Sequence, residues 1–199
     1  MTDKLWLPEG HHWGLVISKE PASTRSGTLD TSAGPKLCWH TAEMHGAEAV
    51  ARVLRQKGDE VHFVIGPSAG DSQVIQMLPL NAVGRGLEHP PGTPETNAAN
   101  AIQVEIADYA KDAHTWPHHY YRDLAALACL ITHRVRIPRH APHPFGLHAT
   151  RFTGDGWIKA SGHVGHEHAP NQPSGHWDPG ALDWAQLSGQ MVLVEKHYT

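Results

Sequence analysis

The sequence predicts an α/β or α+β fold, in which a mixed central β-sheet is flanked by helices. Its 199 residues suffice for one substantial hydrophobic core. Short apolar runs bounded by turn-forming residues alternate with longer segments of helical periodicity. The sequence contains no internal repeat or linker between them. We therefore expect residues 1–199 to form a single domain, with a core at about 34–185 and an N-terminal extension at 1–33.

The first half of the predicted core contains three strands and a helix. A short apolar run at residues 34–40 predicts a strand that ends at His40. Apolar residues at helical spacing then predict a helix over residues 43–57. Two β-branched runs follow, at residues 61–65 and 73–78, with turn-forming residues between them. This pattern predicts a β-hairpin.

The second half begins with a strand at residues 101–106. Three aliphatic residues alternate there with polar ones, so Glu105 is expected to project from the face of the sheet opposite to those aliphatic side chains. An apolar stripe predicts a long helix over residues 118–136. Residues 139–180 are rich in His, Pro and Gly and predict loops around a few ordered pieces. A last apolar segment covers residues 181–198.

Composition excludes several classes of protein. A formal charge of −4 gives no basic field for nucleic acid, so no nucleic-acid partner is expected. The sequence has no run of 18 apolar residues and no basic and apolar leader, which argues against membrane insertion and against a signal peptide. We expect synthesis in the cytoplasm. Cys38 and Cys129 lie in apolar runs and are expected to be buried, reduced thiols.

Histidine is unusually abundant, with 18 copies. Because histidine is the commonest metal ligand, this surplus suggests a metal site. A catalytic zinc site needs three protein ligands and an open position. His40 at a strand end is one candidate, and residues 162–180 supply the others: His163, His166, His168, His176 and Asp178. The alternative for each histidine is an ordinary loop residue.

Four short motifs together resemble the N-acetylmuramoyl-L-alanine amidase type 2 family. They are WHT at 39–41, TNAANAIQVEI at 96–106, VGHEHAP at 164–170 and HWDPGALDW at 176–184. Each motif alone is weak, but their order and spacing are specific. The resemblance covers about residues 34–185 and is strongest to the amidase domains of endolysins from phages of actinobacteria. It implies a fold like that of peptidoglycan-recognition proteins.

The resemblance also implies a set of zinc ligands. In the family these are the His of the first strand, the His of a Gly-His motif and the Asp before Pro-Gly. At the matching positions this chain has His40, His166 and Asp178. Gly162-His163 also fits the Gly-His dipeptide, but we prefer His166 because Ala169-Pro170 follows it as in relatives. With this register His168 is a loop residue or a neighbour of the ligands.

Catalytic and substrate-binding residues follow from the same resemblance. Glu105 corresponds to a glutamate beside the metal-bound water; the alternative is a solvent-exposed strand carboxylate. Many relatives have a lysine two residues before the ligand Asp, where this chain has His176. A protonated His176 would stabilise the oxyanion of the reaction. Asn97 and His89 precede the Glu105 strand and are candidates for substrate binding, with ordinary loop residues as the alternative.

The resemblance implies zinc-dependent hydrolysis of the amide between N-acetylmuramic acid and L-alanine. Zinc (Zn²⁺) held by two neutral imidazoles and a carboxylate keeps a positive charge that activates water and polarises a carbonyl. We expect a phage or prophage endolysin that acts on bacterial peptidoglycan after holin-type release. We also expect no separate wall-binding domain, and we favour a monomer. The alternatives are a non-catalytic peptidoglycan-binding module and a cytoplasmic amidase that recycles muropeptides.

Overall fold

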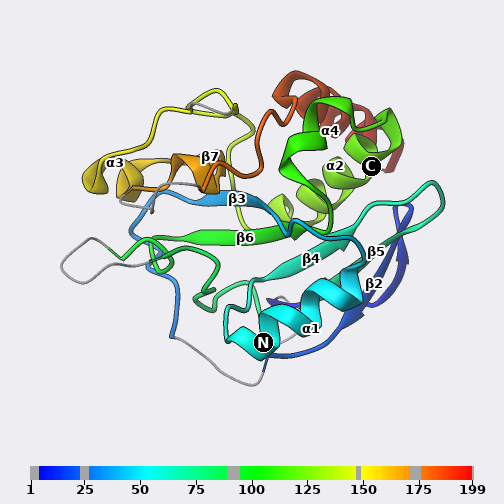
Figure 1. The fold of residues 1–199 in the computed structure, drawn as a ribbon, viewed down its shortest axis with the longest axis horizontal. Helices are drawn as coiled ribbons and strands as arrows, with labels where there is room; N and C mark the ends of the chain where they lie inside the picture. Colours follow the sequence, from blue (N-terminus) through cyan, green and yellow to red (C-terminus); the bar gives the residue numbers. More distant parts are fainter. Residues whose placement is uncertain (1–4, 23–26, 89–94, 147–148, 171–175, 199) are drawn as a thin grey trace.

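A mixed β-sheet forms the centre of the molecule (Figure 1). The computed structural model describes residues 5–22, 27–88, 95–146, 149–170 and 176–198. Within these residues the sheet has seven strands in the order β1-β2-β5-β4-β6-β3-β7. The strands are β1 Gly10–His12, β2 Leu15–Lys19, β3 Lys36–Thr41, β4 Phe63–Gly66, β5 Ser72–Gln76, β6 Ala101–Ile106 and β7 Gly162–Gly165. This architecture confirms the predicted fold class.

Most neighbouring strands of the sheet are parallel. The exceptions are the pair β1–β2 and the pair β4–β5, which are antiparallel. The second pair is the hairpin that the sequence predicts. The strands β4, β6, β3 and β7 run parallel to one another, so their carboxyl ends meet at one edge of the sheet. Ligand sites of open α/β sheets occur at such edges.

Helices cover both faces of the sheet (Figure 1). Helix α1 (Ala47–Lys57) packs against β4 and β5, where its buried residues meet Val64 and Ile75. Helices α2 (His118–Thr132) and α4 (Trp184–Tyr198) pack against each other and cover the opposite face. The shorter helical elements are the helix α3 Gly154–Lys159 and the 3-10 helices η2 Ala110–Thr115 and η3 His166–His168.

The ordered core is wider than the predicted range of 34–185. Strand β2 pairs in parallel with β5, and Leu15 and Ile17 on it are buried together with Leu7. At the other end, Leu187 and Met191 of α4 are buried against the core. The N-terminal segment therefore contributes strands rather than only an extension. Its short strands carry too little periodic signal to be separated from the polar residues around them.

Several element boundaries also differ from the prediction. Helix α1 begins at Ala47 rather than at 43, because Gly46 has φ 89° and Glu43 has φ 53°, both outside the helical region. Helix α2 ends at Thr132 rather than at 136. The His- and Pro-rich region after 139 supplies the edge strand β7 in addition to loops.

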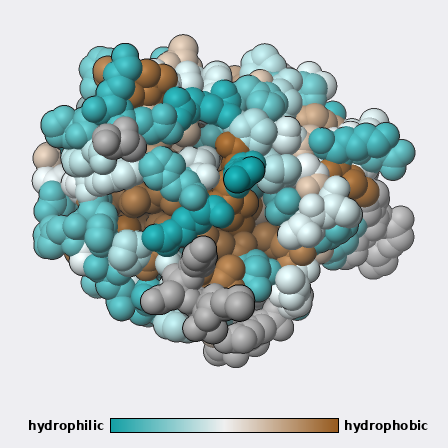
Figure 2. Space-filling model, turned by 180° about the vertical axis from the view of Figure 1, so that it is seen from behind, coloured by the Kyte–Doolittle hydropathy of each residue, from teal (hydrophilic) through white to brown (hydrophobic). Residues whose placement is uncertain are grey.

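Cys38 and Cys129 are buried and unpaired, as predicted. No helix in the described part of the chain is long and apolar enough to cross a membrane. Seen from behind, hydrophilic side chains cover most of the surface, with hydrophobic residues showing among them near the centre of this face (Figure 2).

Candidate metal centre and cleft

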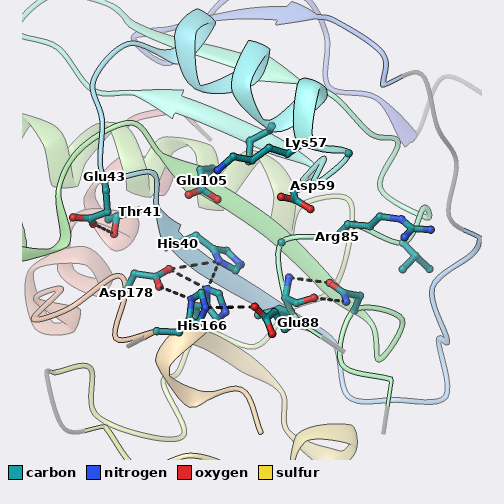
Figure 3. Close-up of a pocket in the computed structure, with 18 of the residues that line it drawn as sticks. His40, Thr41, Glu43, Lys57, Asp59, Arg85, Glu88, Glu105, His166 and Asp178 are labelled. Atoms are coloured by element: carbon teal, nitrogen blue, oxygen red, sulfur yellow. Dashed lines mark hydrogen bonds and ion pairs between the residues drawn. The ribbon is translucent and has the colours of Figure 1, made fainter. Parts of the chain in front are cut away.

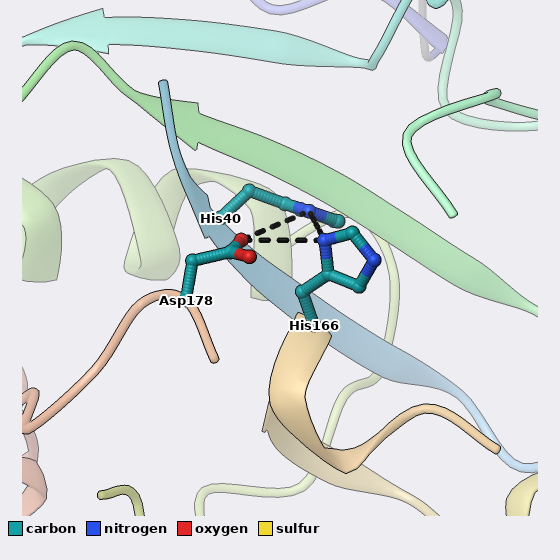
Figure 4. Close-up of side chains that lie close together, drawn as sticks. All are labelled: His40, His166 and Asp178. Atoms are coloured by element: carbon teal, nitrogen blue, oxygen red, sulfur yellow. Dashed lines mark hydrogen bonds and ion pairs between the residues drawn. The ribbon is translucent and has the colours of Figure 1, made fainter. Parts of the chain in front are cut away.

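Three side chains that could bind a metal ion meet at the carboxyl end of the parallel strands. His40 lies near the end of β3, and His166 directly follows β7 at the start of η3. Because β3 and β7 are parallel neighbours, these two residues are brought to the same edge although 126 positions separate them. Asp178 reaches them from the loop that leads to α4 (Figure 4).

The spacing of the three groups suits one metal ion. His40 Nδ1 lies 3.1 Å from His166 Nδ1. Asp178 Oδ2 lies 3.6 Å from His40 Nδ1 and 3.3 Å from His166 Nδ1. Ligand atoms about 2.0–2.1 Å from a tetrahedral zinc are about 3.3 Å apart, so this triangle has the required size. Two imidazoles and one carboxylate are also the donor types that zinc accepts.

Electrostatics favour the metal-binding forms of His40 and Asp178. Burial, and then the neighbouring His166, lower the pKa of His40 to about 3, so its imidazole is neutral near pH 7. Burial alone would raise the pKa of Asp178, but His166 and then His40 outweigh it and hold this pKa below its usual value. A neutral imidazole and an ionised carboxylate are the forms that coordinate a cation.

His163, the alternative ligand, lies away from this cluster. It is fully buried in β7, where its Nδ1 accepts a hydrogen bond from Trp39 Nε1 at 3.2 Å. Its ring packs against Trp184 of α4, with the ring centroids 4.8 Å apart. Trp39 belongs to the core on the α2 and α4 side of the sheet. The geometry therefore favours His166 over His163.

Glu105 lies beside the cluster. It is the register partner of His40 in the parallel pairing of β3 and β6, and it lines the same cleft. Only 8% of it is exposed, and β6 lies between β4 and β3, so the alternative of an exposed strand carboxylate is wrong. Burial, and then Asp178, raise the pKa of Glu105 to about 8. A pKa near neutrality suits a group that both accepts and donates a proton.

His176 lies at the rim of the cleft. Its ring stacks on that of His166, with centroids 4.4 Å apart and an interplanar angle of 27°. Its Nδ1 lies 4.0 Å from Asp178 Oδ1, and its Nε2 lies 3.8 Å from Glu88 Oε1. Burial, and then His166, lower the pKa of His176. The neutral imidazole is therefore favoured at neutral pH over the protonated form that would stabilise an oxyanion by its charge.

The cleft has a volume of about 910 Å³. Many of the side chains that line it are charged (Figure 3). Charged residues from several elements line it: Glu43, Lys57, Asp59, Arg85, Glu88 and Glu95. Lys57, at the end of α1, points toward Glu105 (Figure 3) and lowers the pKa of that carboxyl group. Lys57 was not predicted from the sequence, because a lysine on the polar face of an amphipathic helix carries no distinguishing signal.

The two residues predicted to bind substrate have different outcomes. Asn97 lines the cleft, but its amide is occupied within the protein. Its Oδ1 accepts hydrogen bonds from Leu87 N at 3.1 Å and Gln103 Nε2 at 2.9 Å, and its Nδ2 donates to Leu87 O at 2.8 Å. Asn97 thus braces the loop that carries Glu88. His89 lies outside the described residues.

The fold and the three-ligand cluster define an α/β protein with a candidate catalytic metal centre in an open cleft. Its family follows from sequence comparison. The family model for N-acetylmuramoyl-L-alanine amidase matches residues 15–181, and the chain therefore belongs to this family. No curated protein matches the chain.

Several solved structures share the fold. N-acetylmuramoyl-L-alanine amidase LysC from Clostridium intestinale URNW superposes with a TM-score of 0.54 at 15% identity, covering 88% of this chain and 97% of that chain. Staphylococcus aureus hydrolase AmiA, in complex with its ligand, gives 0.52 at 13% identity, with 98% and 88% covered. A mutant endolysin from Bacillus subtilis gives 0.50 at 17% identity, with 89% and 99% covered. At these identities the likeness shows the fold alone.

Proposed function

We propose that this chain is a zinc-dependent N-acetylmuramoyl-L-alanine amidase that hydrolyses the amide between N-acetylmuramic acid and L-alanine in peptidoglycan. The observation that carries the proposal is the cluster of His40, His166 and Asp178, with Glu105 beside it in an open cleft. Membership of the amidase family supplies the reaction class. A binding module would need neither the three ligand groups nor a buried carboxyl group beside them.

The three cluster residues would hold the zinc ion. When bound, zinc supplies Lewis acidity toward water and toward the amide carbonyl. Proton transfer and hydrogen bonding to the reacting groups come from side chains of the protein. His40 lies near the end of β3, His166 directly after β7, and Asp178 in a loop. All three residues line the cleft, together with Glu105 and His176.

Glu105 acts as the general base and then as the general acid. It accepts a proton from the water molecule whose oxygen attacks the carbonyl carbon. The carbon–nitrogen bond then breaks, and Glu105 delivers that proton to the leaving nitrogen of L-alanine. The carboxylate is thereby restored, and the products are a free carboxyl group and a free amine. Burial, and then Asp178, raise the pKa of Glu105 to about 8, so its carboxylate is a stronger base than that of an exposed glutamate.

His176 donates a hydrogen bond to the oxyanion of the tetrahedral intermediate. Its stacking on His166 holds the imidazole at the rim of the cluster, facing the cleft. Because its pKa is lowered, the neutral imidazole is the donor at neutral pH. A hydrogen bond from a neutral group is weaker than one from a lysine ammonium. We therefore expect slower turnover than a lysine at this position would support.

The stem peptide occupies the polar cleft. Lys57 and Arg85 supply positive charge along it, and Asp59 and Glu88 supply negative charge. A peptide that carries both carboxylate and amino groups is suited to such a lining. Asn97 supports this wall through Leu87, and His89 remains a proposed substrate contact.

We further propose the biological role of a phage or prophage endolysin, made in the host cytoplasm and acting on the wall after holin-type release. The motif resemblance supports this role. Endolysins are also named among the structures that share the fold. A cytoplasmic amidase for muropeptide recycling has the same chemistry and differs in the size of its substrate.

Digestion of purified peptidoglycan tests the proposal. The protein, with its zinc content measured, is incubated with insoluble sacculi and, separately, with soluble muropeptides. Mass spectrometry should find stem peptides with a free N-terminal L-alanine and glycan strands with intact muramic acid. Cleavage of sacculi supports the endolysin role, whereas cleavage of soluble muropeptides alone favours recycling. Binding to sacculi without release of peptide would overturn the catalytic proposal.

A further inference from the structure

We propose that His168 is a positioning residue for the metal centre, because its imidazole fixes the short turn that presents His166. The inference rests on the proposed function, since it concerns the same zinc site. From the sequence, His168 was expected to be a loop residue or a neighbour of the ligands.

Both ring nitrogens of His168 are used inside the protein. The side chain is fully buried. The backbone N–H of Gly165 donates to its Nδ1 at 2.8 Å. A backbone N–H can only donate, so Nδ1 is unprotonated and the ring hydrogen is on Nε2. That Nε2–H donates to the carbonyl of Pro144 at 3.0 Å, which can only accept. The hydrogen-bond network therefore fixes one neutral tautomer.

These bonds close the turn around a metal ligand. Gly165 directly precedes His166, so the bond from Gly165 to His168 spans the ligand residue. A second bond, from the N–H of Ala169 to the carbonyl of His166 at 3.0 Å, ends the turn. The backbone of His166 is thus held on both sides, which limits the directions that its imidazole can take.

The same turn is tied to the second ligand. The N–H of Glu167 donates to the backbone carbonyl of Asp178 at 2.9 Å. A Cβ added to Gly165 would lie 2.6 Å from Pro179 Cδ, which shows how closely the two segments pack. Because His168 fixes the turn, it also fixes the position of the Glu167 N–H that binds the backbone carbonyl of Asp178.

The outer side of the imidazole is anchored in the loop region before β7. The ring centroid of Phe145 lies 5.1 Å away, and that of Phe152 lies 6.4 Å away. The N–H of Phe152 donates to the carbonyl of His168 at 2.9 Å. His168 therefore joins the turn of the ligand to two neighbouring segments, through Pro144 and through Phe152.

His163 provides a matched control. It is also a fully buried imidazole and lies in β7, close to the same turn. Its hydrogen bond comes from Trp39, and its ring packs on Trp184 rather than on the ligand turn. Loss of the His163 ring should lower the stability of the fold without changing the arrangement of His166 and Asp178.

The test measures zinc affinity and the absorption of a cobalt-substituted protein in full-length variants. Zinc affinity is measured by competition with a chromophoric chelator, and the visible spectrum of bound Co²⁺ reports the ligand geometry. We expect His168→Leu to bind zinc about 10- to 100-fold more weakly, as for residues that orient metal ligands, and to change the cobalt spectrum. His163→Leu should lower the unfolding temperature but keep the wild-type affinity and spectrum.

A pair of polar variants tests the hydrogen bond itself. His168→Asn places an oxygen where Nδ1 stands and can still accept from Gly165. His168→Gln instead places its amide nitrogen near the position of Nε2 and can still donate to Pro144. We expect the Asn variant to bind zinc more tightly than the Gln variant. This comparison tests the role of the hydrogen bond between Gly165 and His168 even if His168→Leu does not fold.

Several results would overturn the inference. One is a folded His168→Leu variant with the zinc affinity and cobalt spectrum of the wild type. Another is a His163→Leu variant whose zinc affinity falls as much as that of His168→Leu, and a third is equal zinc affinity in the His168→Asn and His168→Gln variants. A wild-type chain that binds neither zinc nor cobalt overturns it together with the zinc part of the proposed function. Since no peptidoglycan enters these measurements, failure of amide cleavage alone overturns the proposed function and leaves the role of His168 standing.

Discussion

His40 and Glu105 are direct partners in the parallel register of β3 and β6. In a parallel pair, register partners project from the same face of the sheet, so a candidate metal ligand and a candidate general base lie side by side on rigid backbone. A site built on strands holds its geometry more closely than one built on loops. His166 in the turn η3 and Asp178 in a loop are the exceptions, and these two segments are joined by the hydrogen bond from Glu167 N to Asp178 O.

Substitution of the candidate ligands should abolish metal binding. We expect about one zinc per wild-type chain, and far less in His40→Ala or His166→Ala, because two remaining ligands cannot hold a structured site. Amidase activity should be lost with the metal. Elemental analysis of dialysed protein measures the first effect and peptide release the second. His163→Ala is the control and should keep its zinc. The opposite result, an empty site in His163→Ala and a full one in His166→Ala, would reverse the ligand assignment.

Glu105→Gln should separate catalysis from metal binding. The amide has nearly the same shape but cannot accept a proton, so we expect turnover to fall about 10²- to 10⁴-fold. Zinc content and the thermal melting curve should match those of the wild type. Rates of peptide release, with zinc measured in the same sample, check this prediction. Turnover at the wild-type rate would exclude Glu105 as the base.

His176→Ala should reduce kcat more than it raises KM, because its hydrogen bond forms to the oxyanion of the transition state. We expect a loss of about 10²-fold, the scale of one oxyanion donor. His176→Lys should restore or exceed the wild-type rate by supplying a charged donor. His114→Ala, an exposed histidine in η2, is the control. Equal rates in wild type and His176→Ala would leave His176 as a packing partner of His166.

Gly165→Ala should weaken zinc binding. An added Cβ would lie 2.6 Å from Pro179 Cδ and 3.2 Å from Glu167 Cγ, so the segment next to Asp178 has to move. Overpacking of this kind costs about 1–3 kcal/mol of folding free energy. Gly189→Ala in α4 is the matched control, because nothing lies within 4 Å of its added Cβ. Chelator competition and urea unfolding measure both effects; wild-type affinity in Gly165→Ala would show that the turn adapts.

Buried histidines should make the fold sensitive to acid. Burial lowers the pKa of His62 to about 4, and this side chain accepts from Gln103 N and donates to Ala82 O. Its reference pKa is about 6.5, so between these two values the unfolded chain binds the proton more readily. Stability is therefore full above about pH 6.5 and falls as pH drops toward 4, by at most about 1.4 kcal/mol per pH unit for this group.

Urea unfolding of wild type and His62→Gln between pH 7 and pH 4 checks this dependence. Glutamine has no titrating group in this range, so the decline of unfolding free energy with falling pH should be shallower in the variant. Burial also lowers the pKa of His163 to about 3. His163 therefore contributes to the decline of unfolding free energy with falling pH in both proteins. Identical slopes in the two proteins would show that His62 does not contribute to acid sensitivity.

Local sequence patterns determined much of the fold. The strand that ends near His40, the hairpin of β4 and β5, and the strand that carries Glu105 were all predicted, because β-branched runs between turn residues are local signals. Motif resemblance then identified the ligand candidates. The short strands β1 and β2 were missed, since three to five residues carry little periodicity.

Only the tertiary structure decided which side chains meet. His40 and His166 are 126 positions apart, and the parallel pairing of β3 with β7 brings them within 3.1 Å. The same pairing buries His163 in β7 against Trp39, away from the cleft. Lys57 is the last residue of α1, and it lines the cleft because the helix ends beside it. Periodicity reports which face of its own element a residue occupies, whereas a metal site depends on how distant elements pair, and that is fixed by packing across the whole sheet.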